Sequence, residues 1–368
     1  MGYPFVEIDL EKIAANARLL VDLCKKQDIE VIGVTKVVCA DTAIAQAILS
    51  GGVKALGDAR IQNLRKLREA GIKVPLMLLR IPMPSEVAEV VQIAEYSLVS
   101  EYATLERLSQ AARQVGRTHK VILMVDMGDW REGVVPQKIL PLVEQALLLP
   151  GIKVQGFGAN FACYGGLIPT EENLGRLIDL TRQARREFSH ELPVISGGNS
   201  SNVELLLKSA IPPEINQLRL GESILLGRES VNRKPIPGAF QDAFTLHAEV
   251  VEVQEKPSVT PGEICRDAFG NLPVLKDRGI RKRAIAAIGR QDVILEGLRP
   301  ILPGVEILGG SSDHLILDVT DAHQDINVGQ ELCFFMEYGA LAHVMISPYV
   351  SRVYKHYNDC CYEAACCK

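Results

Sequence analysis

The sequence predicts a closed (β/α)8 barrel of parallel strands followed by a C-terminal β-rich domain. Eight short apolar runs recur between residues 31 and 221, and a segment with helical periodicity separates most neighbouring runs. This alternation of strand and helix is typical of a parallel sheet that closes on itself. Beyond Gly238 the apolar residues lose helical spacing, and Pro and Gly turns separate the segments, which indicates β structure.

The first expected element is a helix over residues 9–27, where apolar residues recur at helical spacing behind Asp9, a residue type that caps helices. The first barrel strand follows at 31–36. It is a continuous apolar, β-branched run that ends in Lys36, which is typical of a strand buried on both faces. The other seven strands are expected at 53–58, 75–80, 96–100, 120–126, 154–160, 192–196 and 216–221.

An open doubly wound sheet is the structural alternative. It is disfavoured because no G-x-G-x-x-G motif follows the first strand. Two prolines and a glycine within 232–240 indicate a linker. We therefore expect a barrel over residues 1–235, a β domain over 236–356, and a Cys-rich tail over 357–368 that is disordered or appended to the fold.

Composition excludes several classes of function. The 368-residue chain has a net charge of −5 and no basic block, which argues against a nucleic-acid partner. No apolar run reaches the roughly 18 to 20 residues of a membrane span, and no secretory signal is visible. The cysteines before the tail are scattered in apolar contexts, so a reduced, cytoplasmic location is expected. The seven histidines lack metal-binding spacing, so we predict no metal site.

All eight expected strands end in polar residues, and active sites of such barrels form at these ends. Lys36 is the most informative, because a lysine that closes a buried strand is costly unless its charge is lost or paired. One solution is covalent attachment of an aldehyde cofactor. The alternative is a side chain that reaches solvent at the barrel mouth. The strand-end residues are Lys36, Asp58, Arg80, Ser100 with Glu101, Asp126, Asn160, Ser196 and Arg219.

Two loops favour a phosphorylated cofactor. SGGNSSN at 196–202 and RLGES at 219–223 follow the seventh and eighth strands, where barrels of this kind hold phosphate. Each loop brings Gly and Ser to the start of a helix, so backbone N–H groups and hydroxyls converge. An ordinary helix cap is the alternative for each loop alone. Together with Lys36, the two loops point to pyridoxal 5'-phosphate (PLP).

These segments resemble the alanine-racemase-like enzymes that use PLP. The resemblance runs in order from Tyr3 to about Tyr354, and it implies the barrel, the C-terminal β domain, the cofactor and amino-acid racemisation. It is carried by VTKVVCAD, LGDARIQN, MVDMGDWREG, GFGANFACYG, SGGNSSN, RLGES, DAFGNLPVLKDRGIRKRAIAAIG and SSDHLILDV.

The resemblance also implies roles for individual residues. Lys36 matches the lysine that binds PLP, and Arg219 matches the arginine that hydrogen-bonds the pyridine nitrogen. Arg131 matches an arginine oriented toward the substrate carboxylate, and Asn160 lies beside the cofactor where alanine racemases have a histidine. The groups implied to hold the phosphate are Ser200, Gly221, Glu222, Ser223 and, from the second domain, Tyr349.

The chain departs from the family pattern in two places. Alanine racemases have a tyrosine shortly after the PLP lysine, whereas residues 37–40 here read Val-Val-Cys-Ala, so the substrate pocket differs. Their second catalytic base is a tyrosine from the partner subunit, and Asp267 aligns with it. Asp267 would need burial to raise its pKa into a useful range. This role implies a homodimer with active sites at the subunit interface.

The expected activity is therefore PLP-dependent racemisation of a small-molecule amino acid by two-base α-proton transfer between Lys36 and Asp267. The resemblance implies L- and D-ornithine, or a similar basic amino acid, as the substrate. Lysine, alanine and serine are the alternative substrates. A PLP-dependent decarboxylase, in which Cys265 would matter, and a non-catalytic PLP-homeostasis protein are the alternative functions.

A basic substrate also needs a carboxylate to receive its side-chain ammonium. The sequence does not choose among the four carboxylates that lie near strand ends, which are Asp58, Glu101, Asp129 and Glu222.

Overall fold

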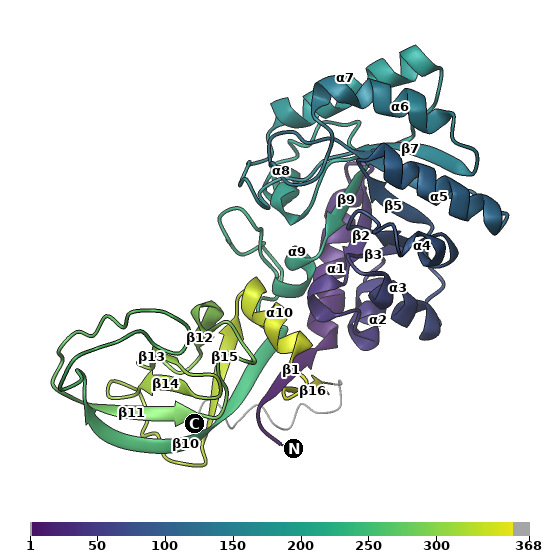
Figure 1. Cartoon of the computed structure of the whole chain (residues 1–368). Helices are drawn as coiled ribbons and strands as arrows, with labels where there is room; N and C mark the ends of the chain where they lie inside the picture. Colours follow the sequence, from purple (N-terminus) through teal and green to yellow (C-terminus); the bar gives the residue numbers. More distant parts are fainter. Residues whose placement is uncertain (1, 356–368) are drawn as a thin grey trace. The chain divides into compact units, whose positions relative to one another are not determined.

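The computed structural model describes residues 2–355, so the Cys-rich tail expected at 357–368 lies outside the described residues. The chain forms two compact units, residues 11–241 and residues 2–10 together with 242–355. Figure 1 follows the elements of each unit in chain order. Among the helices of residues 2–355, none combines the length and apolar character that a bilayer span requires.

The first unit contains a closed barrel of eight strands in sequence order, and each strand pairs in parallel with its neighbours. This confirms the (β/α)8 barrel predicted from the sequence. The strands are β2 (Glu30–Val34), β3 (Ala55–Asp58), β4 (Leu76–Leu78), β5 (Tyr96–Val99), β6 (His119–Met124), β7 (Ile152–Gly158), β8 (Val194–Ser196) and β9 (Gln217–Leu220).

Helices connect the strands, and their starts follow local sequence signals. The Asp41 carboxylate accepts amide hydrogen bonds from Ala43 and Ile44 at the start of α2, and Thr170 forms a capping box with Asn173 at the start of α7. The helices of this unit are α1 (Leu10–Lys25), α2 (Thr42–Ser50), α3 (Ile61–Glu69), α4 (Val87–Ile93), α5 (Tyr102–Gln114), α6 (Ile139–Leu147), α7 (Glu171–Phe188), α8 (Val203–Leu207) and α9 (Glu222–Leu226). Short 3-10 turns are η1 (Lys36–Val38), η2 (Pro136–Lys138) and η3 (Ser200–Asn202).

The barrel strands contribute a continuous apolar core. Side chains from five successive strands form one buried cluster, as expected of a barrel that is filled with side chains instead of being an open pore. Its members are Ile32, Ala55, Met77, Leu98, Ile122 and Met124. Because this core is packed, polar chemistry is confined to the strand ends.

The second unit is built on an antiparallel sheet in the order β12-β15-β10-β11-β14-β13. The long strand β10 also pairs with the N-terminal strand β1, which in turn pairs in parallel with β16. The elements are β1 (Phe5–Asp9), β10 (Phe244–Pro257), β11 (Ile280–Ala286), η4 (Leu295–Gly297), β12 (Leu298–Pro300), β13 (Glu306–Gly310), β14 (Leu315–Asp318), β15 (Glu331–Met336), α10 (Tyr338–Ile346) and β16 (Ser351–Lys355).

Two elements of this unit differ from the sequence-based scheme. The chain begins with strand β1, whereas the scheme began with a helix and assigned residues 1–235 to the barrel. The strand is only five residues long, and only two of its side chains, Val6 and Ile8, are buried. Its alternation of buried and less buried residues is therefore too short to predict a strand from the sequence. The helix α10 was also missed, because its apolar residues read as a continuation of β structure.

The segment expected to be a linker, residues 232–240, is fastened to the barrel unit at its end. The buried Asn16 on α1 donates from Nδ2 to the carbonyls of Ile224 (3.0 Å) and Phe240 (2.8 Å), and its Oδ1 accepts the Phe240 amide (2.7 Å). Arg228 and Pro235 also form an antiparallel bridge. One buried amide side chain therefore fixes where the chain leaves the barrel.

Burial of His119 at the start of β6 makes stability sensitive to acid. The side chain is 2% exposed, its Nε2 lies 2.8 Å from the Ser97 hydroxyl, and desolvation lowers its pKa to about 4. In the unfolded chain the His119 side chain takes up a proton near pH 6.5, whereas in the folded chain it does so only near pH 4. The free energy of unfolding therefore falls as the pH is lowered through this window.

Between pH 7 and pH 4 the free energy of unfolding of the unaltered protein falls. We predict that this fall is smaller by about 3 kcal/mol in His119→Gln. Urea unfolding at a series of pH values measures this difference. The matched control is His190→Gln, which changes an exposed histidine of the same unit and should follow the unaltered protein. Parallel pH profiles for His119→Gln and the unaltered protein would contradict the assignment.

Candidate active site

Lys36 lies two residues beyond β2, at the end of the barrel where the strands terminate. It opens the 3-10 turn η1, which is held by amide hydrogen bonds from Val38 and Ala40 to the Thr35 carbonyl. The turn closes with Cys39 and Ala40 in the left-handed region, at φ values of 51° and 48°. These positions are unfavourable for non-glycine residues, so the turn around Lys36 is tightly determined by its surroundings.

The Lys36 residue is open to solvent, but protein atoms crowd its ammonium and displace part of its hydration. This desolvation lowers its pKa, and the positive charge of Arg131 acts in the same direction. The nearby groups Cys163, Asp58 and Glu132 oppose the effect without cancelling it. Lys36 therefore has the properties of an amine that is more readily available in its neutral, nucleophilic form than a free lysine.

Arg219 lies within the last strand, β9, and is 4% exposed. Its guanidinium donates to the Ser196 hydroxyl, to the Ala159 carbonyl (2.6 Å) and to Asn160 Oδ1 (2.9 Å). Burial lowers its pKa to about 10, and the like charge of Arg131 adds to this effect. Arg219 thus remains a cation at neutral pH, and neutral acceptors hold it in place.

Arg131 follows β6 and forms an ion pair with its neighbour Glu132 through two nitrogens. Its third nitrogen, Nη1, lies 2.7 Å from Cys163 Sγ. Glu132 also accepts a hydrogen bond from Asn160 Nδ2 (2.8 Å). Asn160 therefore links the Arg131–Glu132 pair to Arg219, and the three strand ends carrying these residues form one polar network.

The loops after β8 and β9 meet at Ser200. Its hydroxyl lies 3.0 Å from the Ser223 hydroxyl and accepts the amide N–H groups of Ser223 (3.2 Å) and Gly221 (3.4 Å). Gly221 lies against the end of β2, since a Cβ there would be 3.1 Å from Val34 Cβ. Two hydroxyls and two N–H donors thus converge next to the strand that leads to Lys36. This donor set fits a phosphate group.

Glu222 and the other candidate carboxylates have different surroundings. The Glu222 side chain pairs with Arg228 Nε (3.2 Å), Asp58 accepts from Thr35 Oγ1 (2.8 Å) and Asn63 Nδ2 (2.9 Å), and Asp129 accepts the amides of Cys163 and Tyr164. These three carboxylates therefore have structural partners. Glu101 is exposed and directly precedes α5, on the side of the barrel where β5 ends.

Asp267 and Tyr349 belong to the second unit and are both exposed. The Asp267 carboxylate accepts the amides of Asn271 (2.8 Å) and Phe269 (2.9 Å), and the Asn271 amide makes the largest contribution to lowering its pKa. Within the single chain this is the reverse of the burial and raised pKa that the sequence analysis required of a base. The Tyr349 amide donates to the Ser347 hydroxyl.

The sequence analysis missed Glu132 and Cys163, although both lie in segments that it singled out. The available signal was position: Glu132 is the acid next to Arg131 in the loop after β6, and Cys163 follows Asn160 in the loop after β7. Such adjacency predicts proximity to the barrel mouth but not the contact that the two loops make with each other.

The chain is similar to known proteins over nearly its whole length. The ornithine racemase of Acetoanaerobium sticklandii is 45% identical over 351 residues, covering 95% of this chain and 99% of the relative. The lysine racemase of Thermotoga maritima is 42% identical over 355 residues, covering 96% and 99%. The crystal structure of alanine racemase from D-cycloserine-producing Streptomyces lavendulae shares the fold, with a TM-score of 0.74, 20% identity and coverage of 97% and 98%.

Residues 8–229 match the family of the alanine racemase N-terminal domain, a span that includes all eight barrel strands and the network around Arg219. Two relatives cover nearly the whole chain at more than 40% identity, so the sequence similarity to racemases extends into the second unit. The chain belongs to the alanine racemase family.

Proposed function

We propose that this protein is a PLP-dependent racemase of ornithine or a similar basic amino acid. The observation that carries the proposal is the desolvated Lys36 amine together with the donor cluster of Ser200, Gly221 and Ser223, which lies against the end of β2, the strand that leads to Lys36. The names of the two relatives that cover nearly the whole chain support the substrate class. Racemisation is a reaction in which an amino acid loses its α-proton and regains one on the opposite face.

The residues of the barrel mouth fit the cofactor. PLP, when bound, supplies an electron sink that acidifies the α-proton of an attached amino acid. Lys36 provides the amine for covalent attachment, and the hydroxyls and N–H groups around Ser200 provide donors for the phosphate. Arg219 provides a cationic donor for the ring nitrogen, with Asn160 beside it. Because the pKa of Arg219 stays near 10, it donates a hydrogen bond without giving up its proton at neutral pH.

Lys36 is the group that accepts and returns the α-proton on one face of the substrate. Its lowered pKa increases the fraction of neutral amine, which is the form that accepts a proton. Arg131 is the donor for the substrate carboxylate, and its ion pair with Glu132 fixes the orientation of the guanidinium. For the side-chain ammonium of a basic substrate we favour Glu101, because the other three candidate carboxylates already have structural partners.

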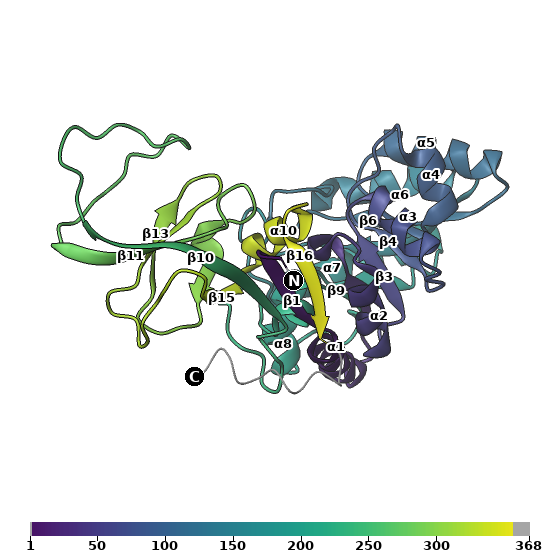
Figure 2. The same cartoon turned by 90° about the horizontal axis from the view of Figure 1, so that it is seen from below.

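The second unit suggests how a second proton-transfer group is supplied. The loop between β10 and β11 extends away from its sheet (Figure 2), and its residues 261–279 are all exposed. Such an apolar, exposed loop is typical of a subunit interface, so we propose a homodimer in which this loop, with Asp267, is buried by the partner subunit. The exposed apolar residues of the loop are Ile264, Phe269, Leu272, Val274 and Leu275.

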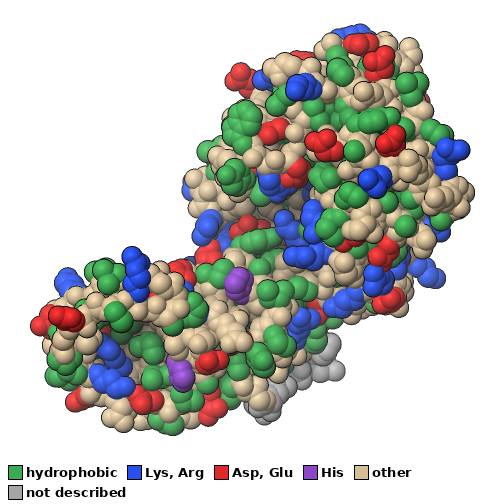
Figure 3. Space-filling model, in the orientation of Figure 1, with side chains coloured by type: hydrophobic (Ala, Val, Ile, Leu, Met, Phe, Trp, Pro, Cys, Tyr) green, Lys and Arg blue, Asp and Glu red, His purple; other side chains and the backbone are tan. Residues whose placement is uncertain are grey.

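Cys24, Cys163 and Cys265 carry free thiols, which is the usual state of cysteine in a reducing compartment, and we propose a cytoplasmic location. Positive and negative side chains are interspersed on the face of the barrel unit drawn in Figure 3. This mixture suits a protein whose partners are small molecules and a second subunit.

We predict that the protein, incubated with L-ornithine or L-lysine in deuterium oxide, exchanges the α-proton and loses optical rotation. Lys36→Ala should lower both rates by at least about 100-fold, because it removes both the attachment point and a base. Lys54→Ala, which changes an exposed lysine at the other end of the barrel, should leave them unchanged. Carbon dioxide release without racemisation would instead indicate a decarboxylase.

We predict a different pattern for Asp267→Asn. Racemisation should fall at least about 100-fold while one enantiomer still exchanges its α-proton through Lys36, because only one of two bases is lost. Asp277→Asn is the matched control, since Asp277 is an exposed residue of the same loop whose carboxylate also accepts a backbone amide hydrogen bond, from Gly279. Racemisation at the unaltered rate in Asp267→Asn would assign the second base to another residue.

A further inference from the structure

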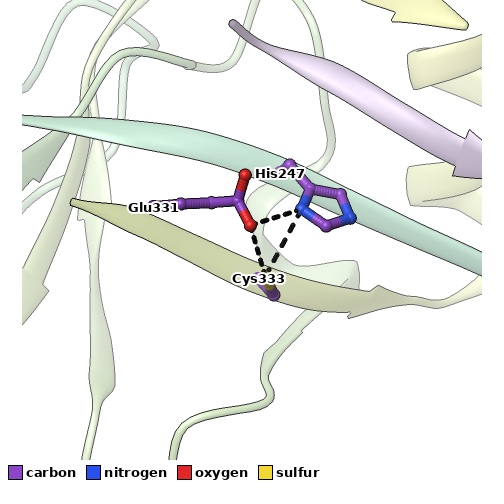
Figure 4. Close-up of side chains that lie close together, drawn as sticks. All are labelled: His247, Glu331 and Cys333. Carbon is purple, nitrogen blue, oxygen red and sulfur yellow. Dashed lines mark hydrogen bonds and ion pairs between the residues drawn. The ribbon is translucent and has the colours of Figure 1, made fainter. Parts of the chain in front are cut away.

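A cluster of three potential metal ligands lies in the second unit, apart from every residue assigned above. It consists of His247 on β10 and Glu331 and Cys333 on β15 (Figure 4). His247 Nδ1 lies 2.8 Å from Glu331 Oε1, and Cys333 Sγ lies 3.4 Å from each of these two atoms. An imidazole nitrogen, a carboxylate oxygen and a thiol sulfur thus face one another.

Backbone register brings the three side chains together. In the antiparallel pairing of β10 with β15, His247 lies directly opposite Cys333. Glu331 precedes Cys333 by two residues and therefore points to the same face of the sheet. On the other side of β10, Phe5 lies opposite His247 and stacks on its ring at 4.4 Å between centroids. The site is built on paired strands, which hold ligands more rigidly than loops do.

Burial and outer contacts also suit a metal site. His247 is 6% exposed and Cys333 is 8% exposed, whereas the Glu331 side chain is 25% exposed and leaves a route of entry. The Tyr3 hydroxyl donates to Glu331 Oε2 at 2.8 Å, which leaves Oε1 directed at His247 and Cys333. Hydrogen bonding of a ligating carboxylate by a second group is a regular feature of metal centres.

We propose that His247, Glu331 and Cys333 bind a divalent transition metal ion, with Zn²⁺ as the best match. Thiolate, imidazole and carboxylate are the protein ligands of zinc. Tetrahedral Zn²⁺ places nitrogen and oxygen ligands about 3.3 Å apart and sulfur about 3.5 Å from either. Only the contact between His247 and Glu331 has to lengthen, by roughly half an ångström, and one position is left for a further ligand.

Binding would displace protons. The thiol of Cys333 must lose its proton, because the thiolate is the form that binds a metal ion. Metal affinity should therefore rise with pH. In the alternative, His247 and Glu331 form only a hydrogen-bonded pair beside the buried Cys333 thiol, and the protein would bind no metal ion there.

The test uses the full-length holoenzyme with Cys360, Cys361, Cys366 and Cys367 replaced by Ser, so that tail thiols contribute no ligands. Equilibrium dialysis against Zn²⁺, with metal counted by atomic emission, should give one ion per chain. Co²⁺ added in place of Zn²⁺ should produce a thiolate-to-metal charge-transfer band in a difference spectrum. Both signals should rise with pH.

Variants in this background identify the ligands. Cys333→Ser should abolish the charge-transfer band, and Glu331→Gln should weaken Zn²⁺ affinity by more than the roughly 10- to 100-fold that loss of an outer-shell partner of a ligand costs. Cys265→Ser is the control, because it removes an exposed thiol of the same unit. Glu331→Gln keeps a side chain of the same size at a partly exposed position, so it remains informative if Cys333→Ser fails to fold.

Thermal unfolding provides an independent readout. Zn²⁺ should raise the melting temperature of the background protein, and Glu331→Gln should remove most of that increase. Absence of stoichiometric Zn²⁺ in the background protein, or a charge-transfer band that persists in a folded Cys333→Ser variant, would overturn the proposal.

Discussion

Closure of the barrel by pairing of β2 with β9 is the constraint on which the candidate active site depends. The pairing aligns Glu30–Gly33 with Gln217–Leu220, so the loop that begins at Gly221 lies beside the segment that leads to Lys36. An open sheet would leave these two strands at separate positions. Because the first and last strands meet, residues nearly 190 positions apart in the chain become neighbours.

The same closure brings like charges together, and nearby acceptors offset their repulsion. Three cations, Lys36, Arg131 and Arg219, gather at one end of the barrel. Glu132 neutralises Arg131, and neutral oxygen acceptors solvate Arg219. The pKa values of Lys36 and Arg219 are both lowered, but a guanidinium stays charged at neutral pH. Among the three cations, Lys36 is therefore the group best suited to the covalent attachment of an aldehyde cofactor that we propose.

Much of the barrel could be predicted from the sequence because buried parallel strands are read from local runs of apolar residues. The eight strands and the polar residues at their ends were found in this way. Features that depend on contacts between distant segments were not found. Glu132 was missed because it links Arg131 to Asn160, which lies on another loop. Strand β1 was missed because its sheet partners, β10 and β16, are far away in the chain, and the His247 cluster because His247 and Cys333 are 86 residues apart. The burial that we propose for Asp267 would come from a second subunit, which a single sequence does not describe.

The central claim is that Lys36 carries the cofactor aldehyde. Borohydride reduction of the protein as purified, followed by proteolysis and mass spectrometry, tests it most directly. The account predicts a phosphopyridoxyl mass addition on the peptide that contains Lys36 and on no other lysine. An unmodified Lys36 peptide, or the addition on a different lysine, would contradict the account.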